Sequence, residues 1–217
     1  NSEATDIARN LLAKVGLGQF FLDGTHLKHE LGGTTLFVVG RDSNNTLRIP
    51  AFMICHSESS ASYATFAKKC KAAGLGKLFG DDRTLYDGLP PLFDGDPPSM
   101  FCDRASAMNA FFDVFKGLTR IFCVWHLIRN IRAHLLKKNG GNLQDNDIWR
   151  IQGVLNEDEY EAAMKALGDK NKLAEAYLRK VDKYRWVGYA IYEKYEVYTY
   201  MNRTNGCVES ITGKYTK

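Results

Sequence analysis

The sequence predicts an α/β protein, in which a mixed sheet comes first and helices follow near the C-terminus. Three short runs of β-forming residues open the chain, with only short links between them. Residues 99–130 then alternate between an apolar run, a stretch with apolar spacings of three and four, and a second apolar run. Strand, helix and strand in this order normally place two parallel strands side by side through a right-handed crossover.

The first three expected strands cover residues 19–25, 34–39 and 48–55, and their short links predict an antiparallel meander. A helix with a serine N-cap is expected at residues 59–73. Residues 75–98 are rich in Gly, Pro and Asp, which predicts a long surface connection with room for a short strand near residues 77–79.

The remaining expected elements continue the alternation and then become helical. They are a strand at 100–102, a helix at 107–115, a strand at 119–125, and helices at 127–138, 145–167, 170–184 and 186–200. A helix at residues 2–15 is expected to precede them, and a last helix to follow residue 204.

Bulk properties narrow the class of protein. A net charge of +4 permits nucleic-acid binding without arguing for it. The five cysteines have no short paired spacing, which indicates reduced, mostly buried thiols in an intracellular protein. No apolar run reaches 18 residues, so no membrane span is expected. The chain begins at Asn1 without an initiator Met, which indicates a piece of a longer protein.

Three carboxylates stand at positions that suit a metal site. Asp23 ends the first strand, Asp103 ends the fourth, and Glu209 lies near the start of the last helix. Such hard oxygen ligands bind Mg²⁺ or Mn²⁺, and two ions about 3.5–4 Å apart can promote phosphodiester displacement. Each aspartate alone could simply cap a turn. The two together favour a site, because an unpaired carboxylate within an apolar run is costly.

Cys123 and His126 form a C-x-x-H pair. Zinc usually needs four ligands and no second close pair completes the set, so a buried thiol and a hydrogen-bonded core imidazole are the ordinary interpretation. The alternative is that His126 lines a site. His126 and Asp103 both follow strand ends, where ligands gather in such sheets.

Basic residues gather in a segment without acids between Asp113 and Asp145. They are Lys116, Arg120, Arg129, Arg132, Lys137 and Lys138. Such a block would attract a phosphate backbone. The alternative is a solvated helix face, since four of the six lie on one expected helix.

Five segments together resemble the Mutator-like element (MULE) transposases, which belong to the DDE transposase and integrase group. They are LDGTH (22–26), ESSASYATF (58–66), CDRASAMNAFFDVF (102–115), CVWHLIRNI (123–131) and TNGCVES (204–210). The resemblance runs in the right order from about residue 20 to residue 210.

The resemblance implies an RNase H-like fold whose five-stranded mixed sheet has the order 3-2-1-4-5, flanked by helices. It implies a core at residues 1–126 and a helical insertion at 127–203. Residues 204–217 would then be the start of the final core helix. Asp23, Asp103 and Glu209 would be the catalytic acids holding two Mg²⁺ or Mn²⁺ ions, with the Cys123 and His126 signature lining the site. Three other glutamates could replace the third acid: Glu157, Glu193 and Glu196.

The implied activity is divalent-metal-dependent DNA cleavage and strand transfer in the nucleus, on transposon ends and target DNA, without a membrane; a homo-oligomer would be compatible with it. Arg129, Arg132, Arg120, Lys137 and Lys138 would contact the DNA. The zinc modules expected beside such a core do not appear in this sequence. The chain is therefore expected to be either a catalytic core or a domesticated regulator that binds DNA or protein without catalysis.

Overall fold

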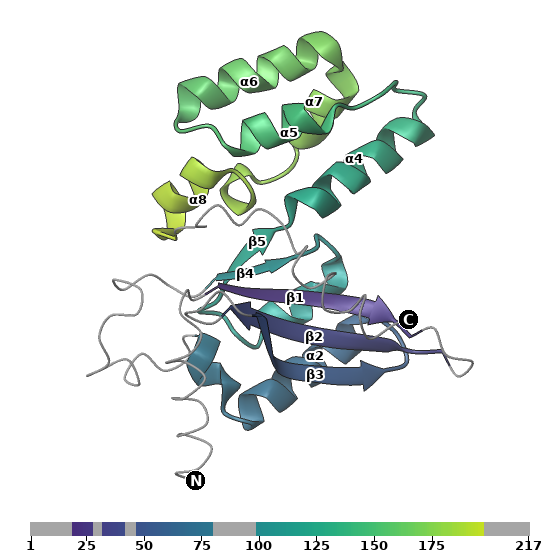
Figure 1. Ribbon diagram of the computed structural model, residues 1–217, viewed down its shortest axis with the longest axis vertical. Coiled ribbons are helices and arrows are strands. Elements are labelled where there is room, and N and C mark those ends of the chain that lie inside the picture. Colours follow the sequence, from purple (N-terminus) through teal and green to yellow (C-terminus); the bar gives the residue numbers. More distant parts are fainter. Residues whose placement is uncertain (1–18, 28–31, 42–46, 80–98, 198–217) are drawn as a thin grey trace. The chain divides into compact units, whose positions relative to one another are not determined.

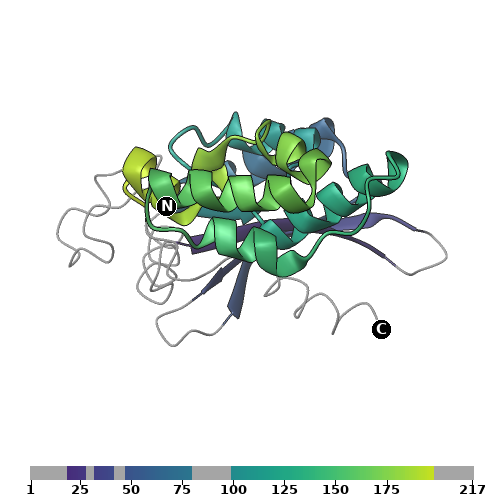
Figure 2. The same cartoon turned by 90° about the horizontal axis from the view of Figure 1, so that it is seen from above.

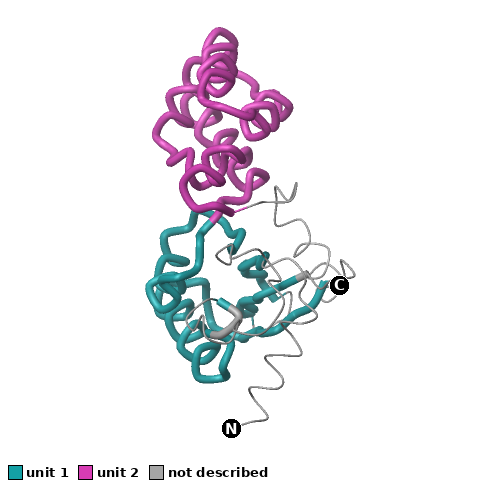
Figure 3. The backbone as a smooth tube through the Cα atoms, turned by 90° about the vertical axis from the view of Figure 1, so that its left-hand side faces the viewer, with its two compact units in different colours: residues 1–120, 205–217 teal, residues 121–204 magenta. Residues whose placement is uncertain are grey.

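The structure is a computed structural model of residues 1–217, and it describes residues 19–27, 32–41, 47–79 and 99–197. The chain divides into two compact units (Figure 3): residues 1–120 with 205–217 form unit 1, and residues 121–204 form unit 2. Each unit has its own hydrophobic core. The predicted helix at residues 2–15, and the last helix with Glu209, lie outside the described residues.

A five-stranded mixed sheet has the order β3-β2-β1-β4-β5 (Figure 1), which confirms the predicted α/β class and strand order. The strands are β1 (Gln19–His26), β2 (Thr34–Arg41), β3 (Leu47–Cys55), β4 (Ser99–Cys102) and β5 (Thr119–Phe122). The first three form the predicted antiparallel meander. Strand β4 runs parallel to β1, in a register from Gln19 opposite Ser99 to Leu22 opposite Cys102.

Helical segments of unit 1 pack on one face of this sheet. Helix α2 (Ser60–Ala72) begins where the side chain of Ser59 accepts a 3.2 Å hydrogen bond from the backbone N–H of Ser62, as an N-cap does. Two predictions are wrong here. The strand expected near residues 77–79 is part of the 3₁₀ helix η1 (Leu75–Phe79). The helix expected at 107–115 is shorter, and consists of η3 (Ser106–Met108) and α3 (Asn109–Phe112).

The core beneath these helices is rich in phenylalanine. Phe111 on α3 is fully buried, and its ring centroid lies 5.9 Å from that of Phe66, 6.2 Å from that of Phe79 and 5.1 Å from that of Phe115. Edge-on and tilted aromatic pairs at these distances add to the hydrophobic gain of burial. The cluster therefore ties α2, η1 and the segment after β4 to one another.

Unit 2 is helical, and Figures 1 and 2 show its helices packed against one another. They are α4 (Val124–Lys137), α5 (Asp145–Gln152), α6 (Glu157–Lys170), α7 (Lys172–Leu178), η4 (Lys183–Arg185) and α8 (Gly188–Tyr195). Their apolar faces enclose the fully buried Trp186. None of the helices in the described part of the chain is both long and apolar enough to cross a membrane.

Several helix boundaries in unit 2 differ from those predicted. The single helix expected at 145–167 is two, because α5 ends at Gly153 and Asn156 starts α6 by accepting a 2.9 Å hydrogen bond from the N–H of Glu159. The strand expected to reach residue 125 ends at Phe122, since the next residue already caps helix α4. The helices expected at 170–184 and 186–200 are the shorter α7 and α8.

Candidate functional site

Asp23 and Asp103 each follow one of two paired residues on neighbouring parallel strands. The register of β1 and β4 ends at Leu22 opposite Cys102, and each aspartate is the next residue. Two residues before the aspartates, the rings of Phe21 and Phe101 stack at 5.4 Å. Side chains alternate along a strand, so the aspartates emerge on the same face as these rings. Both are half-buried, and the structure thus brings these two predicted acids together.

Each aspartate also accepts a hydrogen bond from the next residue of the backbone. The N–H of Gly24 donates to Asp23 Oδ1 at 2.9 Å, and the N–H of Arg104 donates to Asp103 Oδ1. The prediction that Asp23 ends the first strand is wrong, because β1 continues to His26 and stays paired with β2. A carboxylate offers about four acceptor positions, so one backbone bond leaves capacity for a cation at both residues.

The donor set fits a small divalent cation. Mg²⁺ is often held by one or two carboxylates, while waters and substrate phosphates complete its octahedral shell. Within the described residues, no three His, Cys, Asp or Glu side chains form a group that could hold an ion by themselves. Glu209, the third predicted acid, lies outside that part of the chain. The described protein therefore offers an incomplete shell of hard oxygen ligands.

Arg120 on β5 donates hydrogen bonds to the segment that begins at Asp103. Its Nη2 donates to the carbonyl oxygens of Asp103 at 2.7 Å and Ala105 at 3.2 Å, and its Nε donates to Cys102 Sγ at 3.1 Å. Its Nη1 donates to Asn109 Oδ1. These contacts give Arg120 a set of acceptors inside unit 1, whereas the charge pattern had placed it among the DNA-binding residues.

Glu58 is a site residue that sequence reasoning missed. Its Oε1 lies 1.7 Å from where a Cβ of residue 24 would stand, so a side chain at this position would displace the carboxylate. The buried Tyr63 on α2 donates its O–H to Glu58 Oε1 at 3.0 Å. Burial raises the pKa of Tyr63 far above its usual range, and the nearby charges of Glu58 and Asp23 add to this shift. Tyr63 therefore stays a donor and holds Glu58 over the end of β1.

The sequence contains a signal for this contact. A glycine inside a strand, directly after an acid, marks a close approach, and an acid just before a helix N-cap lies at the same end of the sheet in an α/β fold. Neither feature alone identifies the partner, because the approach depends on how α2 packs over the sheet.

Cys123 and His126 both belong to unit 2. Cys123 is buried at the N-cap of α4, and His126 follows in the first turn, half-buried, with an Nδ1 atom that has no hydrogen-bond partner among the described residues. The four cysteines that the structure describes form no disulfide with one another. No third metal ligand joins Cys123 and His126 within the described residues, so a zinc site is not assembled there.

Helix α4 carries most of the predicted DNA-binding residues. Arg129 is exposed and has no acceptor among the described residues, whereas Arg132 Nη2 pairs with Asp145 Oδ1 at 2.6 Å. Lys137 and Lys138 are exposed near the C-terminal end of the helix, where positive charge is favourable. The opposite face is buried by Leu127, Ile128, Ile131 and Leu135.

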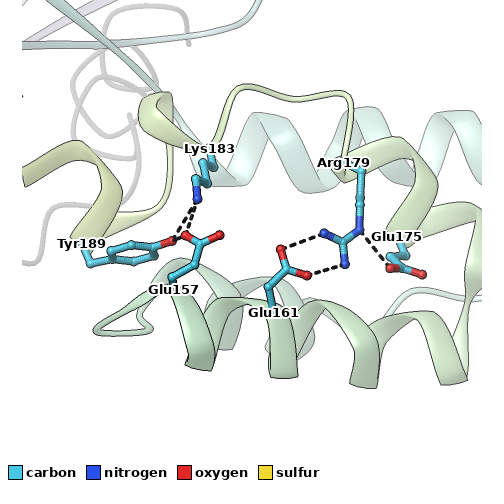
Figure 4. A network of polar contacts seen from close by, with 6 residues as sticks. All are labelled: Glu157, Glu161, Glu175, Arg179, Lys183 and Tyr189. Carbon is cyan, nitrogen blue, oxygen red and sulfur yellow. Dashed lines mark hydrogen bonds and ion pairs between the residues drawn. The ribbon is translucent and has the colours of Figure 1, made fainter. Parts of the chain in front are cut away.

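A second polar cluster lies in unit 2 (Figure 4) and lines a cleft of about 430 Å³. Glu157 accepts hydrogen bonds from Lys183 and from the O–H of Tyr189. Arg179 binds Glu161 through two bonds of 2.8 and 2.9 Å, and Glu175 through one of 3.1 Å. These charges satisfy one another across α6, α7, η4 and α8, so the cluster ties the helices together. Glu157, an alternative third acid, is engaged here.

The stability of unit 2 should depend on pH through Glu157. The bonds from Lys183 and Tyr189 hold the pKa of Glu157 below its ordinary value of 4.5. A lowered folded-state pKa means that its stabilisation is present above the unfolded pKa and lost as the pH falls through the folded value. We expect the melting temperature of Glu157→Gln to vary less with pH below about 4.5 than that of the wild type.

The Glu157 carboxylate is 53% exposed, so Glu157→Gln should lower the melting temperature only slightly near neutral pH. Thermal unfolding followed by circular dichroism between pH 3 and 7 measures both effects. Glu193→Gln is the control, because Glu193 is exposed on α8 and has no ion-pair partner among the described residues. Equal pH profiles for wild type and Glu157→Gln would show that the cluster is not what links pH to stability.

Compared with known protein families and with curated proteins, the chain matches none.

Proposed function

We propose that unit 1 is the catalytic core of a MULE-type DDE transposase with an RNase H-like fold, which cleaves and transfers DNA strands with the help of divalent metal ions. The observation that carries the proposal is the placement of Asp23 and Asp103 after paired residues of parallel β1 and β4, on one face of a five-stranded sheet with the order β3-β2-β1-β4-β5.

Three acids of unit 1 would hold the metal ions. Asp23 and Asp103 would hold Mg²⁺ or Mn²⁺, with Glu209 as the third acid. Such ions supply electrostatic stabilisation to the charge that develops on the oxygens of a phosphodiester during displacement. Each carboxylate already accepts a hydrogen bond from the N–H of the residue that follows it, which orients the carboxylates before DNA arrives.

The partner in this proposal is DNA, as transposon ends and as target, and the place of action is the nucleus. A mildly basic chain with an exposed arginine on α4 supports DNA as the partner. Assembly into a homo-oligomer would fit a reaction that must hold two transposon ends.

Calorimetric titration with Mn²⁺ tests the proposal. The wild type should bind Mn²⁺ and Asp103→Ala should not, because the variant removes one of the two neighbouring carboxylates. Asp113→Ala is the control: Asp113 is exposed at the end of α3, ten positions after Asp103. Binding that survives in Asp103→Ala, or is lost equally in Asp113→Ala, would contradict the proposed site.

The second candidate is a domesticated regulator that binds DNA or a protein without catalysis. The observation that favours it is that both carboxylates already accept a backbone hydrogen bond, a structural role that needs no metal ion. A wild-type protein that binds DNA in a gel-shift assay, but neither binds Mn²⁺ nor nicks DNA with Mg²⁺ present, would support this candidate instead.

Binding of DNA should depend on salt through Arg129. Each phosphate contact contributes a slope of about 0.9 to the dependence of log K on log salt concentration. Arg129→Ala should therefore flatten the slope by about 0.9 for all duplexes, since phosphate contacts do not read sequence. Adding Arg132→Ala should bring the change to at most about 1.8, and less if Arg132 stays paired with Asp145.

Fluorescence anisotropy of a labelled duplex at several salt concentrations measures these slopes. Lys165→Ala provides the comparison, because Lys165 is exposed on α6 and removes the same charge elsewhere in unit 2. An unchanged slope in Arg129→Ala would mean that the basic residues of α4 form only a solvated face.

A further inference from the structure

Arg120 lies in the basic segment of the sequence, but its guanidinium donates hydrogen bonds to groups within the protein. It lies on β5, half-buried, and its guanidinium points at the chain that follows β4. An arginine presents five N–H donors in a rigid, planar fork, so it can fix several acceptors at once.

The acceptors of Arg120 bracket Asp103. They include Cys102 Sγ just before it, the carbonyl oxygen of Asp103 itself, the carbonyl oxygen of Ala105 two residues later, and Asn109 Oδ1 at the start of α3. The ring of Phe112 covers the guanidinium, with the Cζ atom of Arg120 5.2 Å from the ring centroid. One side chain thus binds the end of β4, the turn after it and the next helix.

This arrangement fixes the peptide unit from which the Asp103 side chain leaves. The 2.7 Å bond from Arg120 Nη2 to the carbonyl oxygen of Asp103 sets the plane of that peptide. The bonds to Ala105 and Asn109 keep the turn from unwinding. With this backbone fixed, the side chain of Asp103 is oriented toward the face that it shares with Asp23.

We propose that Arg120 is a positioning residue that holds Asp103 in place for divalent-cation binding, rather than a residue that contacts DNA phosphates; this inference rests on the proposed function. A phosphate could bind Arg120 only if the guanidinium gave up acceptors in the protein. Partners that orient a metal ligand from outside commonly matter about 10–100-fold for metal affinity.

The experiment compares Arg120→Lys, Arg120→Gln and Arg129→Ala in the whole chain, with Mn²⁺ as the probe. Arg120→Lys keeps the positive charge but loses the fork, so a residue that only attracts phosphate would tolerate it. We expect Mn²⁺ affinity to fall about 10-fold or more in calorimetry, while the salt slope of DNA binding stays as in the wild type. Arg129→Ala should do the opposite, with normal Mn²⁺ affinity and a flatter salt slope.

A second readout does not depend on metal. Hydrogen exchange of the backbone amides at residues 104–109 should speed up in Arg120→Lys, whereas amides of β1 and β2 should exchange as in the wild type. If Arg120→Lys does not fold, Asn109→Ala serves instead, because it removes a single acceptor of the fork; it should lower Mn²⁺ affinity to a smaller degree.

The outcomes separate this inference from the proposed function. Wild-type Mn²⁺ affinity and unchanged exchange in Arg120→Lys, together with loss of binding in Asp103→Ala, would overturn only the role of Arg120. A salt slope that flattens in Arg120→Gln as much as in Arg129→Ala, with Mn²⁺ affinity intact, would return Arg120 to the DNA-binding residues. If the wild type itself binds no Mn²⁺, both the proposed function and this inference are wrong.

Discussion

Replacing Asp23 with asparagine is expected to abolish Mg²⁺-dependent nicking of DNA while leaving unit 1 folded. The amide oxygen of asparagine can still accept the hydrogen bond from the N–H of Gly24, so this contact within β1 is kept. The variant loses the negative charge that a hard divalent cation requires from its ligands. A metal ion supplies several kcal/mol of transition-state stabilisation, so the rate should fall by roughly a thousandfold or more.

Conversion of supercoiled plasmid to the nicked form in Mg²⁺ measures this loss, and circular dichroism with thermal unfolding shows whether the fold is kept. Asp113→Asn, which makes the same change at an exposed position of unit 1, should nick at the wild-type rate. Nicking by Asp23→Asn at the wild-type rate would falsify the proposed mechanism. Loss of both nicking and fold would call for the milder Asp103→Asn in the same assay.

The placement of these two acids could be predicted because local sequence features determine it. Short apolar runs identified β1 and β4, and each run ends in an aspartate. The helical spacing between β4 and β5 predicted a crossover, which normally makes parallel neighbours. The pairing of β4 with β1, however, was predicted only from the family resemblance, because the same apolar runs are compatible with several strand orders. The observed register from Gln19 opposite Ser99 then brings the acids to the same level.

The roles of Glu58 and Arg120 could not be predicted in the same way. Glu58 approaches Gly24 only because α2 packs on the sheet in a particular position, and periodicity does not specify that position. Arg120 was grouped with basic residues because a charge pattern shows a cation but not its acceptors. Those acceptors are mostly backbone and side-chain groups of residues 102–109, which β5 meets only in the folded chain.

The errors in unit 2 have a similar origin. Apolar spacing continues through residues 145–167, so a single helix fitted the pattern. The chain instead turns at Gly153, whose lack of a side chain weakens a helix, and the cap at Asn156 starts a new one. Local capping thus competed with periodicity, and the sequence pattern does not show which of the two is stronger.

Replacing Phe111 with alanine should destabilise unit 1 by about 3–5 kcal/mol, the usual cost of removing a buried phenylalanine side chain. The ring is fully buried and contacts the rings of Phe66, Phe79 and Phe115. These neighbours belong to separate segments of the chain, so the surrounding structure cannot easily close the cavity that the variant leaves.

Urea unfolding followed by circular dichroism measures this change in free energy. Phe52→Ala removes the same ring from an edge strand where Phe52 is 64% exposed, so its effect should stay within about 0.5 kcal/mol. Trp186→Ala should also be strongly destabilising, but through the separate core of unit 2. If Phe111→Ala costs no more than Phe52→Ala, the phenylalanine cluster is not what holds α3 to α2 and η1. Because α3 also carries Asn109, which binds Arg120, a loosened cluster should lower Mn²⁺ affinity in the protein that remains folded.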